Sequence, residues 1–358
     1  MKSPAAEAPA GIGAIDPEWL TDALREHHSL PDDLVVADLR TEQIAQDSGF
    51  SSLLYRLHLT GTGVPPTVIV KLPAQSEARG AMEMLGGYTR ELNFYRKVAD
   101  RVPLATPRVY SARMAQDSID FVLVMEDLQN WHNADHLAGL SLRQAQVCIE
   151  QLAGLHAWST LHETEVPEDF PSIDTAIARE VFLPVFALGW QVYRDHSAAS
   201  VPPTVQRYAE RFTELAPQAL DALSRRSMLL HGDIRADNMF FDGDQLKVVD
   251  FQFVCRGAGL ADIGYLISQG LPTGVRRGKD ESLVRQYLRQ LADFGVTDYG
   301  FDEAWRQYRF AVGYLMVLPV ITLVGWDALP ARSRALCIAL VDRAVATIED
   351  IGAVEVFQ

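Results

Sequence analysis

One short stretch of the sequence, residues 231–238, combines side chains that can act on nucleotide phosphates. It reads His-Gly-Asp-Ile-Arg-Ala-Asp-Asn, and an Asp-Phe-Gln run begins later at Asp250. Asp233 can accept a hydrogen bond from an attacking hydroxyl, and Asn238 offers a neutral oxygen to a hard cation. Asp250 offers an anionic oxygen. These residues predict a phosphoryl-transfer site; the alternative is a turn in which the two aspartates only cap backbone groups.

The sequence between these residues predicts the element that brings them together. Asp242-Gly243 lies between two apolar runs, and an Asp-Gly pair in that setting is a strong signal for a β-hairpin. Such a hairpin returns Asp250 to the neighbourhood of Asn238. Asp237 adds negative charge beside the predicted metal ligands, and the sequence leaves open whether it binds a second cation or only the loop.

Strand and helix patterns divide the chain into two parts of different character. Apolar and polar side chains alternate from Leu53 to Thr60, which is the period of a strand with one buried face. Most of the sequence after residue 126 has helical spacing, and Ser141 with Gln144 forms a capping-box pattern. Other elements predicted are helices over residues 16–27, 78–100, 205–225, 281–294 and 332–351, and strands over residues 67–72, 108–115 and 119–125.

The composition excludes several functional classes. The chain has 32 basic and 47 acidic side chains and a net charge of −15, whereas a nucleic-acid-binding protein needs clustered Lys and Arg. Three scattered cysteines argue against a disulfide scaffold or a zinc site and favour a reducing cytoplasm.

The first sixteen residues lack a signal-peptide pattern, and residues 1–15 are predicted to be a disordered lead. Residues 310–326 are strongly apolar, but their glycines and proline favour a buried helix or helix pair over a membrane span.

The segment from His231 to Asn238 and the Asp-Phe-Gln run resemble the aminoglycoside phosphotransferase and choline kinase superfamily, and look closest to its ecdysteroid-kinase-like branch. That family carries a His-Gly-Asp-x-x-x-x-Asn catalytic loop and, in many members, a metal-binding Asp followed by Phe-Gln. The resemblance covers nearly the whole chain after residue 15. It implies an α+β, bilobal protein-kinase-like fold, with a small N-lobe over residues 16–127 that contains an antiparallel sheet, and a larger, mainly helical C-lobe over residues 128–358.

The same resemblance implies roles for the residues of the loop. Asp233 becomes the catalytic base or the residue that orients the acceptor hydroxyl, and Asn238 and Asp250 become Mg²⁺ ligands. His231 holds the shape of the loop instead of transferring protons. Asp262, in a Gly-Leu-Ala-Asp-Ile-Gly-Tyr run, matches a family aspartate that anchors the catalytic lobe and is interpreted as structural.

The resemblance also requires a nucleotide-binding ion pair in the first part of the chain. Such kinases need a strand lysine that neutralises the phosphates and a helix glutamate that holds this lysine in place. Lys71 ends an apolar strand run, and Glu91 lies on the next predicted helix, with Glu83 two turns upstream as the alternative partner. Alone, each residue would be interpreted as a solvated surface charge; their order before Asp233 carries the prediction.

Two further nucleotide contacts are implied. Gly49, Ser51 and Ser52 precede an apolar strand and match the family's phosphate-covering loop, although a plain hairpin turn explains them nearly as well. The chain has no Gly-Lys-Ser/Thr phosphate loop. Glu126 lies in the predicted connector between the lobes, where backbone groups bind the adenine ring in the family.

These observations predict a kinase that uses ATP and Mg²⁺ to phosphorylate a hydroxyl group of a small molecule. The alternative is a nucleotide-binding pseudokinase or regulatory protein without turnover. Gln252 replaces the glycine of the protein-kinase Asp-Phe-Gly motif and no Ala-Pro-Glu segment follows it, which argues against a protein acceptor. Neither nucleic-acid binding nor membrane insertion is expected. The acceptor, the preference for ATP or GTP and the oligomeric state are left open.

Two sets of residues have alternative interpretations. His156 lies on an apolar helix face and is predicted to be a core histidine instead of a catalyst. Aromatic residues of the segment 163–203 and of a later helix either wall the acceptor pocket or form ordinary core. These are Phe170, Phe182, Phe186, Trp190, Tyr193, Trp305, Tyr308 and Tyr314. An apolar wall would favour a bulky hydrophobic alcohol, whereas a rim of carboxylates would favour an amino sugar.

Overall fold

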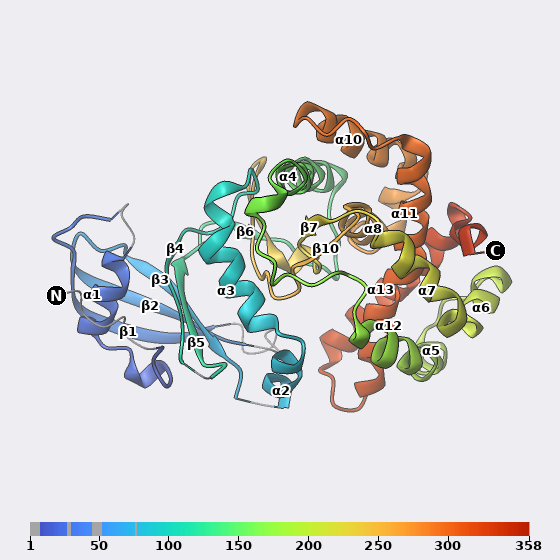
Figure 1. Ribbon diagram of the computed structural model, residues 1–358. Coiled ribbons are helices and arrows are strands. Elements are labelled where there is room, and N and C mark those ends of the chain that lie inside the picture. The colour runs from blue at the N-terminus through green and yellow to red at the C-terminus, as the bar shows by residue number, and fades with distance from the viewer. Residues whose placement is uncertain (1–7, 27–29, 45–51, 76, 117, 358) are drawn as a thin grey trace. The chain divides into compact units, whose positions relative to one another are not determined.

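The computed structural model describes residues 8–26, 30–44, 52–75, 77–116 and 118–357. The chain divides into two compact units (Figure 1). The first contains the residues up to 101 together with 106–131, and the second contains 102–105 and the residues from 132 onwards.

The first unit is built on a five-stranded antiparallel sheet. Its strand order is β1-β2-β3-β5-β4, which places β3 in the middle of the sheet. Lys71 of β3 lies opposite Leu54 of β2 and Leu123 of β5. The strands are β1 (Val35–Ile44), β2 (Ser52–Thr62), β3 (Thr67–Pro73), β4 (Val109–Met114) and β5 (Phe121–Glu126).

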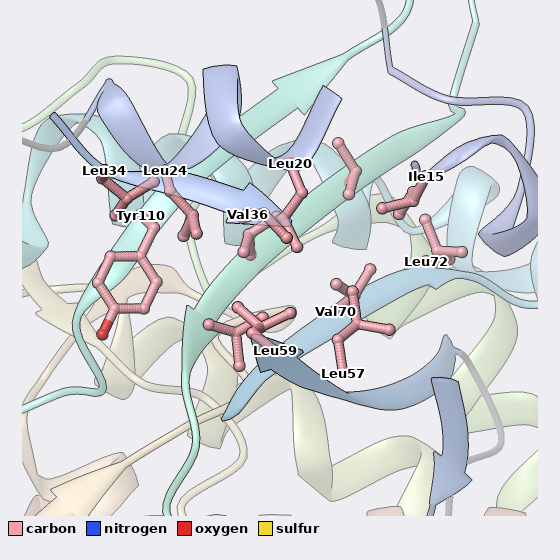
Figure 2. Close-up of a cluster of buried hydrophobic side chains, with 13 residues drawn as sticks. Ile15, Leu20, Leu24, Leu34, Val36, Leu57, Leu59, Val70, Leu72 and Tyr110 are labelled. Carbon is pink, nitrogen blue, oxygen red and sulfur yellow. The ribbon is translucent and has the colours of Figure 1, made fainter. Parts of the chain in front are cut away.

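Alternation along the central strand separates the side chains of an apolar cluster from the side chain of Lys71. Val68, Val70 and Leu72 belong to a buried cluster that Leu20 and Leu24 of helix α1 (Pro17–Arg25) complete (Figure 2). Because side chains of a strand alternate between faces, Lys71 points to the opposite side of the sheet. The apolar core therefore fixes the face on which the lysine lies.

The start of the chain corrects one expectation. Residues 12–14 form a turn of 3-10 helix, and Ile15 is buried in the cluster of Figure 2. Asp16 then caps α1, because its Oδ1 accepts from the backbone N of Trp19 at 2.8 Å. The predicted disorder of residues 1–15 is therefore wrong for the part from residue 8 onwards, since Ile15 buries an apolar side chain that composition alone did not assign to the core.

Two helices follow β3 in the first unit. They are α2 (Glu77–Met84) and α3 (Gly87–Lys97), and Gly86 between them has a φ of 68°. The left-handed conformation suits glycine and interrupts the helix, so the helix predicted over residues 78–100 is divided near Gly86-Gly87.

The second unit is mainly helical and contains two small sheets. One sheet joins β6 (His132–Asn133), β8 (Met239–Asp242) and β9 (Gln245–Val248), and the other pairs β7 (Met228–Leu230) with β10 (Cys255–Gly257). β8 and β9 form the hairpin predicted at Asp242-Gly243. The helices are α4 (Leu142–Leu161), α5 (Leu183–His196), α6 (Pro203–Glu210), α7 (Phe212–Leu223), α8 (Leu260–Ser268), α9 (Thr273–Arg276), α10 (Asp280–Asp293), α11 (Phe301–Leu315), α12 (Val317–Thr322) and α13 (Ala331–Asp350).

The apolar segment 310–326 is a helix pair in the second unit. It comprises the end of α11, then α12, and a 3-10 turn over Leu323–Gly325. Within the described ranges, one helical stretch, Phe301–Gly325, is long and apolar enough to span a membrane, and 67% of its most apolar window is buried inside the protein. Such burial is typical of a core helix.

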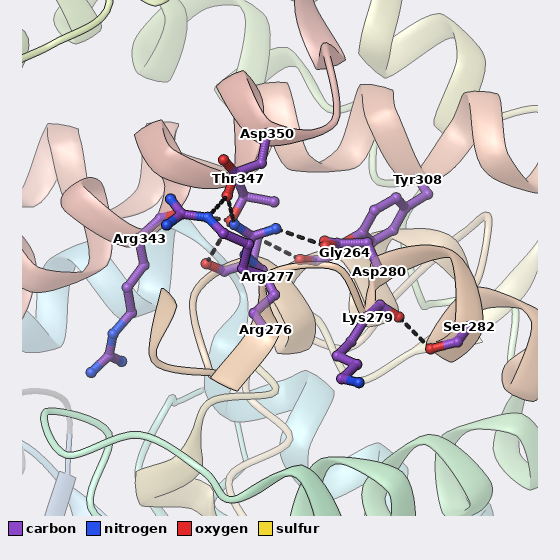
Figure 3. Close-up of polar contacts among 11 residues, drawn as sticks. Gly264, Arg276, Arg277, Lys279, Asp280, Ser282, Tyr308, Arg343, Thr347 and Asp350 are labelled. Atoms are coloured by element: carbon purple, nitrogen blue, oxygen red, sulfur yellow. Dashed lines mark hydrogen bonds and ion pairs between the residues drawn. The ribbon is translucent and has the colours of Figure 1, made fainter. Parts of the chain in front are cut away.

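A buried arginine joins three helices of the second unit (Figure 3). The side chain of Arg276 is fully buried, and its Nη1 donates to Oδ2 of Asp280 at 2.7 Å. Its Nη2 donates to Asp350 of α13. The hydroxyl of Tyr308 donates to the other oxygen of Asp280 at 2.7 Å. The buried charges are therefore paired and hydrogen-bonded, as burial requires.

We predict that Asp280→Ala lowers the free energy of unfolding by about 3–5 kcal/mol, because it leaves Arg276 undercompensated and Tyr308 without its acceptor. Urea denaturation measures the change. The control is Asp244→Ala, which breaks a 2.7 Å ion pair with Arg143 whose side chains are both about two-thirds exposed. The control is expected to change stability little, and equal effects of the two variants would contradict the prediction.

Candidate active site

The segment that follows β7 has a backbone conformation that only glycine adopts easily. Gly232 has a φ of +81°, and a Cβ at this position would lie 2.2 Å from the carbonyl oxygen of Phe253. Both facts require glycine between His231 and Asp233. The His-Gly-Asp order is therefore needed for the loop to pass closely by the turn that follows Asp250.

A buried carboxylate, that of Asp262, anchors the start of this loop. It accepts from the backbone N of His231 at 2.7 Å and of Gly232 at 3.0 Å, and from His156 Nε2 at 3.3 Å. Burial raises the pKa of Asp262, but the hydrogen bond and charge of His156 with the other donors outweigh it, so the pKa lies below its ordinary value. Asp262 is thus structural and His156 is a hydrogen-bonded core residue, as the sequence predicted.

The ring of His231 holds the loop to the strand that leads to Asp250. Its Nδ1 accepts from the backbone N of Asp233 at 3.1 Å, and its Nε2 donates to the carbonyl oxygen of Val249 at 3.1 Å. The ring also packs against Phe251, with the ring centres 4.6 Å apart. Both ring nitrogens are therefore engaged, and His231 shapes the loop as the resemblance implied.

The structure brings Asp233, Asn238 and Asp250 together. Asn238 Nδ2 donates to the backbone oxygen of Asp233 at 2.9 Å and lies 3.4 Å from its Oδ2. The backbone oxygen of Asn238 accepts from Val249 N at 3.0 Å, directly before Asp250. Within the described part of the chain, Asp250 is the only residue other than glycine with a left-handed φ, of 68°. Such strain is typical of functional positions.

Opposing effects act on the pKa of Asp233. Burial raises its pKa above the ordinary value, and the negative charge of Asp250 raises it further, whereas Arg235 opposes both. Arg235 Nε lies 3.4 Å from Asp233 Oδ2, and the two side chains are 29% and 17% exposed. Sequence reasoning missed Arg235, although a cation two residues after a candidate base was a visible signal.

The side-chain oxygens of Asn238 and Asp250 fit a hard cation that takes most of its ligands from groups outside the protein. The donation by Asn238 Nδ2 to Asp233 turns the amide oxygen away from that residue, and Asp250 adds a carboxylate. Among the described residues, no group of three or more His, Cys, Asp and Glu side chains could hold a metal. A cation here would therefore complete its shell with water and phosphate oxygens, which is the habit of Mg²⁺.

The first unit contains the predicted lysine–glutamate pair. Lys71 Nζ donates to Glu91 Oε1 at 2.8 Å, and their side chains are 7% and 1% exposed. The lysine comes from the central strand β3 and the glutamate from α3, on the face of the sheet opposite to the apolar cluster. The structure therefore pairs Lys71 with Glu91 and not with the alternative, Glu83.

The remaining predicted contacts have different outcomes. Gly49 and Ser51 lie outside the described residues. Ser52 is the first residue of β2, is buried, and lies opposite Pro73. Glu126 ends β5, and its Oε2 accepts from the backbone N of Arg108 at 3.0 Å. Their nucleotide contacts remain predictions.

Most of the aromatic residues considered for the acceptor pocket are core. Phe186 stacks on Phe212 with ring centres 3.7 Å apart, and Tyr308 is hydrogen-bonded to Asp280. Six of the eight are buried: Phe170, Phe186, Trp190, Tyr193, Tyr308 and Tyr314. Phe182 and Trp305 are half-buried. For the six buried residues the core interpretation holds.

Comparisons with known proteins identify a family and several structures of similar fold. The sequence model of the ecdysteroid kinase-like family matches residues 46–297. No curated protein is similar enough in sequence to match.

Solved structures of similar fold include a choline kinase from Cryptosporidium parvum, with 10% identity, a TM-score of 0.54, and coverage of 89% of this chain and 88% of that one. An ethanolamine kinase from Plasmodium vivax has 12% identity, a TM-score of 0.53, and coverage of 89% and 86%. The aminoglycoside 2′-phosphotransferase-IIIa, solved as its GDP complex, has 14% identity, a TM-score of 0.53, and coverage of 93% and 99%. The predicted α+β, protein-kinase-like fold is thereby confirmed.

We predict that Asp262→Asn destabilises the protein by about 3 kcal/mol at pH 7, because an amide cannot accept from three donors as the carboxylate does. The pKa of Asp262 is lowered, so the stability it contributes is present above its unfolded pKa and is lost as pH falls through its folded pKa. The deficit of the variant should therefore shrink only below about pH 4. Thermal unfolding from pH 7 to pH 3 tests this, with the exposed Asp293→Asn as control; a deficit that does not change with pH would contradict it.

Proposed function

The chain belongs to the ecdysteroid kinase-like family, and we propose that it transfers the γ-phosphoryl group of ATP, with Mg²⁺, to a hydroxyl group of a small molecule. The observation that carries the proposal is the convergence of Asp233, Asn238 and Asp250 on one loop and hairpin of the second unit. The buried pair of Lys71 and Glu91 in the first unit supports it independently.

Each residue has a role in this proposal. The acceptor oxygen attacks the γ-phosphorus, the bond from that phosphorus to the β,γ-bridging oxygen breaks, and ADP leaves. Asp233 accepts the hydrogen bond, and then the proton, of the attacking hydroxyl. Lys71, oriented by Glu91, offers its ammonium group to the nucleotide phosphates. Asn238 and Asp250 would hold Mg²⁺, which when bound neutralises charge on the phosphates.

The environment of Asp233 supports a role as an acceptor of a proton. Its pKa lies above the ordinary aspartate value, mainly because it is buried, so its carboxylate is more basic than an exposed one. The positive charge of Arg235, whose Nε lies 3.4 Å from Asp233 Oδ2, lowers this pKa and so opposes the effect of burial. A carboxylate whose pKa is raised in this way is suited to accept a proton from the attacking hydroxyl.

A small acceptor is favoured by the segment after Asp250. Phe251 and Gln252 are almost fully buried, at 0% and 1% exposure. Gln252 stands where protein kinases have the glycine of Asp-Phe-Gly, and no Ala-Pro-Glu segment follows it, so the sequence favours a small acceptor over a protein. The competing hypothesis is a nucleotide-binding pseudokinase. It requires that Asp233, Asn238 and Asp250 converge although the protein catalyses no phosphoryl transfer.

We predict that Asp233→Asn reduces phosphoryl transfer at least 100-fold, because it removes the proton acceptor. Transfer from ATP is measured against a panel of amino alcohols, aminoglycosides, sterols and small alcohols. Because the pKa of Asp233 is raised on folding, the folded state disfavours its charge, so the variant should melt no lower than wild type. A wild type that binds nucleotide with Mg²⁺ but phosphorylates no acceptor would favour the pseudokinase instead.

We predict that Arg235→Gln moves the acidic limb of the kcat profile to higher pH. Activity requires ionised Asp233 and falls as pH drops through its pKa; Arg235 lowers that pKa, so removing the guanidinium raises it. Arg235→Lys keeps the positive charge and should shift the limb less. A uniform loss of kcat at every pH, with the limb unmoved, would show that Arg235 acts in another way.

A further inference from the structure

Two segments about a hundred residues apart are joined by hydrogen bonds in the second unit. Strand β6 pairs with β8, and the backbone N of Ala134 donates to the carbonyl oxygen of Met239 at 3.0 Å. Asn133 Nδ2 donates to the backbone oxygens of Asp237, at 2.9 Å, and Met239, at 3.1 Å. Residues 132–137 therefore lie directly against the end of the loop that carries the candidate catalytic residues.

The contact becomes reciprocal at His136 and Asp237. The backbone N of His136 donates to Asp237 Oδ1 at 2.9 Å. In return, Nδ1 of His136 accepts from the backbone N of Ala236 at 3.0 Å. Ala236 and Asp237 begin the 3-10 turn that ends at Asn238. The two bonds thus fix the part of the chain that sets the spacing between Asp233 and Asn238.

The histidine is held in the state that this contact needs. Burial, with the nearby cations Arg235 and Arg343, lowers the pKa of His136 to about 3, so the ring is neutral and Nδ1 is an acceptor. Its proton then lies on Nε2, and this buried atom has no hydrogen-bond partner among the described residues. An unpaired buried donor is destabilising. Stability alone therefore does not explain a histidine at this position. The acceptor nitrogen Nδ1, which binds the backbone N of Ala236, explains it.

The segment 132–137 is itself fixed to the C-terminal helix. Arg343 of α13, drawn in Figure 3, donates from Nη1 to the carbonyl oxygen of His136 at 2.9 Å and from Nη2 to that of Leu137. Arg332 donates to Asp135 Oδ1 at 2.7 Å. Residues 132–137, which hold the loop, are thus themselves hydrogen-bonded to the long helix α13.

We propose that His136 and Asp237 are positioning residues for phosphoryl transfer, which hold Asp233 and Asn238 in register through their reciprocal hydrogen bonds. This inference rests on the proposed function. At Asp237, whose role the sequence left open between a second cation and the loop, the proposal gives one carboxylate oxygen, Oδ1, a role in holding the loop. Misplacement of a reacting group by about 1 Å can reduce turnover about 100-fold, so a clamp of this kind has a measurable effect.

The test compares two substitutions of the same histidine. His136→Leu keeps a similar volume without an acceptor, whereas the side-chain oxygen of His136→Asn can take the place of Nδ1. We expect the leucine variant to lose about 10–100-fold in kcat with a much smaller change in the KM for either substrate, because positioning acts in the transition state. The asparagine variant should recover most of that loss. The Mg²⁺ concentration for half-maximal rate should rise in the leucine variant, since Asn238 is displaced.

A second pair covers the case in which His136→Leu does not fold. Asp237 is half-buried, and Asp237→Ala removes the acceptor for the backbone N of His136, whereas Asp237→Asn keeps an oxygen there. The alanine variant should lose turnover and the asparagine variant should recover most of it. Wild-type turnover in the leucine and alanine variants, or equal losses within each pair, overturns the inference while leaving the proposed function intact. A wild type without phosphoryl transfer overturns the proposed function itself.

Discussion

The burial of one carboxylate, that of Asp262, is the interaction on which the candidate site of the second unit depends. A buried charge is tolerated only where enough donors meet it, and here they are two successive backbone N–H groups and a histidine ring. The two backbone donors directly follow β7, and the histidine ring lies on α4. The carboxylate lies in the first turn of α8. Satisfying this single charge therefore fixes three elements against one another and sets the direction in which the chain leaves His231.

Asp262 and Asp233 have pKa values that are shifted in opposite directions. Asp262 is surrounded by donors, and its pKa lies below the ordinary value, whereas Asp233 is half-buried and feels the negative charge of Asp250, and its pKa lies above the ordinary value. The first arrangement stabilises the fold; the second works against it, as does the left-handed φ of Asp250. Environments that push the pKa values of neighbouring acids apart separate structural from chemical roles. The strain at Asp250 and the unfavourable charge at Asp233 persist because Asp262 and His231 hold the backbone on both sides.

Sequence reasoning succeeded where the determining pattern is local. Lys71 ends an apolar strand run and Glu91 lies on the next helix, and the family resemblance with their order before Asp233 predicts the pair that the structure contains. The Asp-Gly signal likewise locates the β8–β9 hairpin.

Sequence reasoning failed where a contact between distant residues determines the structure. The pairing of His136 with Ala236 joins positions a hundred residues apart, and Ile15 is ordered only because a sheet buries it. The aromatic residues were undecided for the same reason, since neighbours such as Phe212 beside Phe186 determine whether a ring is core.

The distribution of charge in each unit explains why the proposed chemistry needs a divalent cation. In the first unit the positive charge of Lys71 is largely balanced by Glu91 at 2.8 Å. In the second, Arg235 faces three carboxylates, those of Asp233, Asp237 and Asp250, which raise its pKa. Neither set of residues presents a clear excess of positive charge to a triphosphate, and the whole chain carries −15. In the proposed reaction, Arg235 therefore lowers the pKa of Asp233, and the charge that attracts and neutralises the phosphates would come from Mg²⁺ at Asn238 and Asp250, together with Lys71.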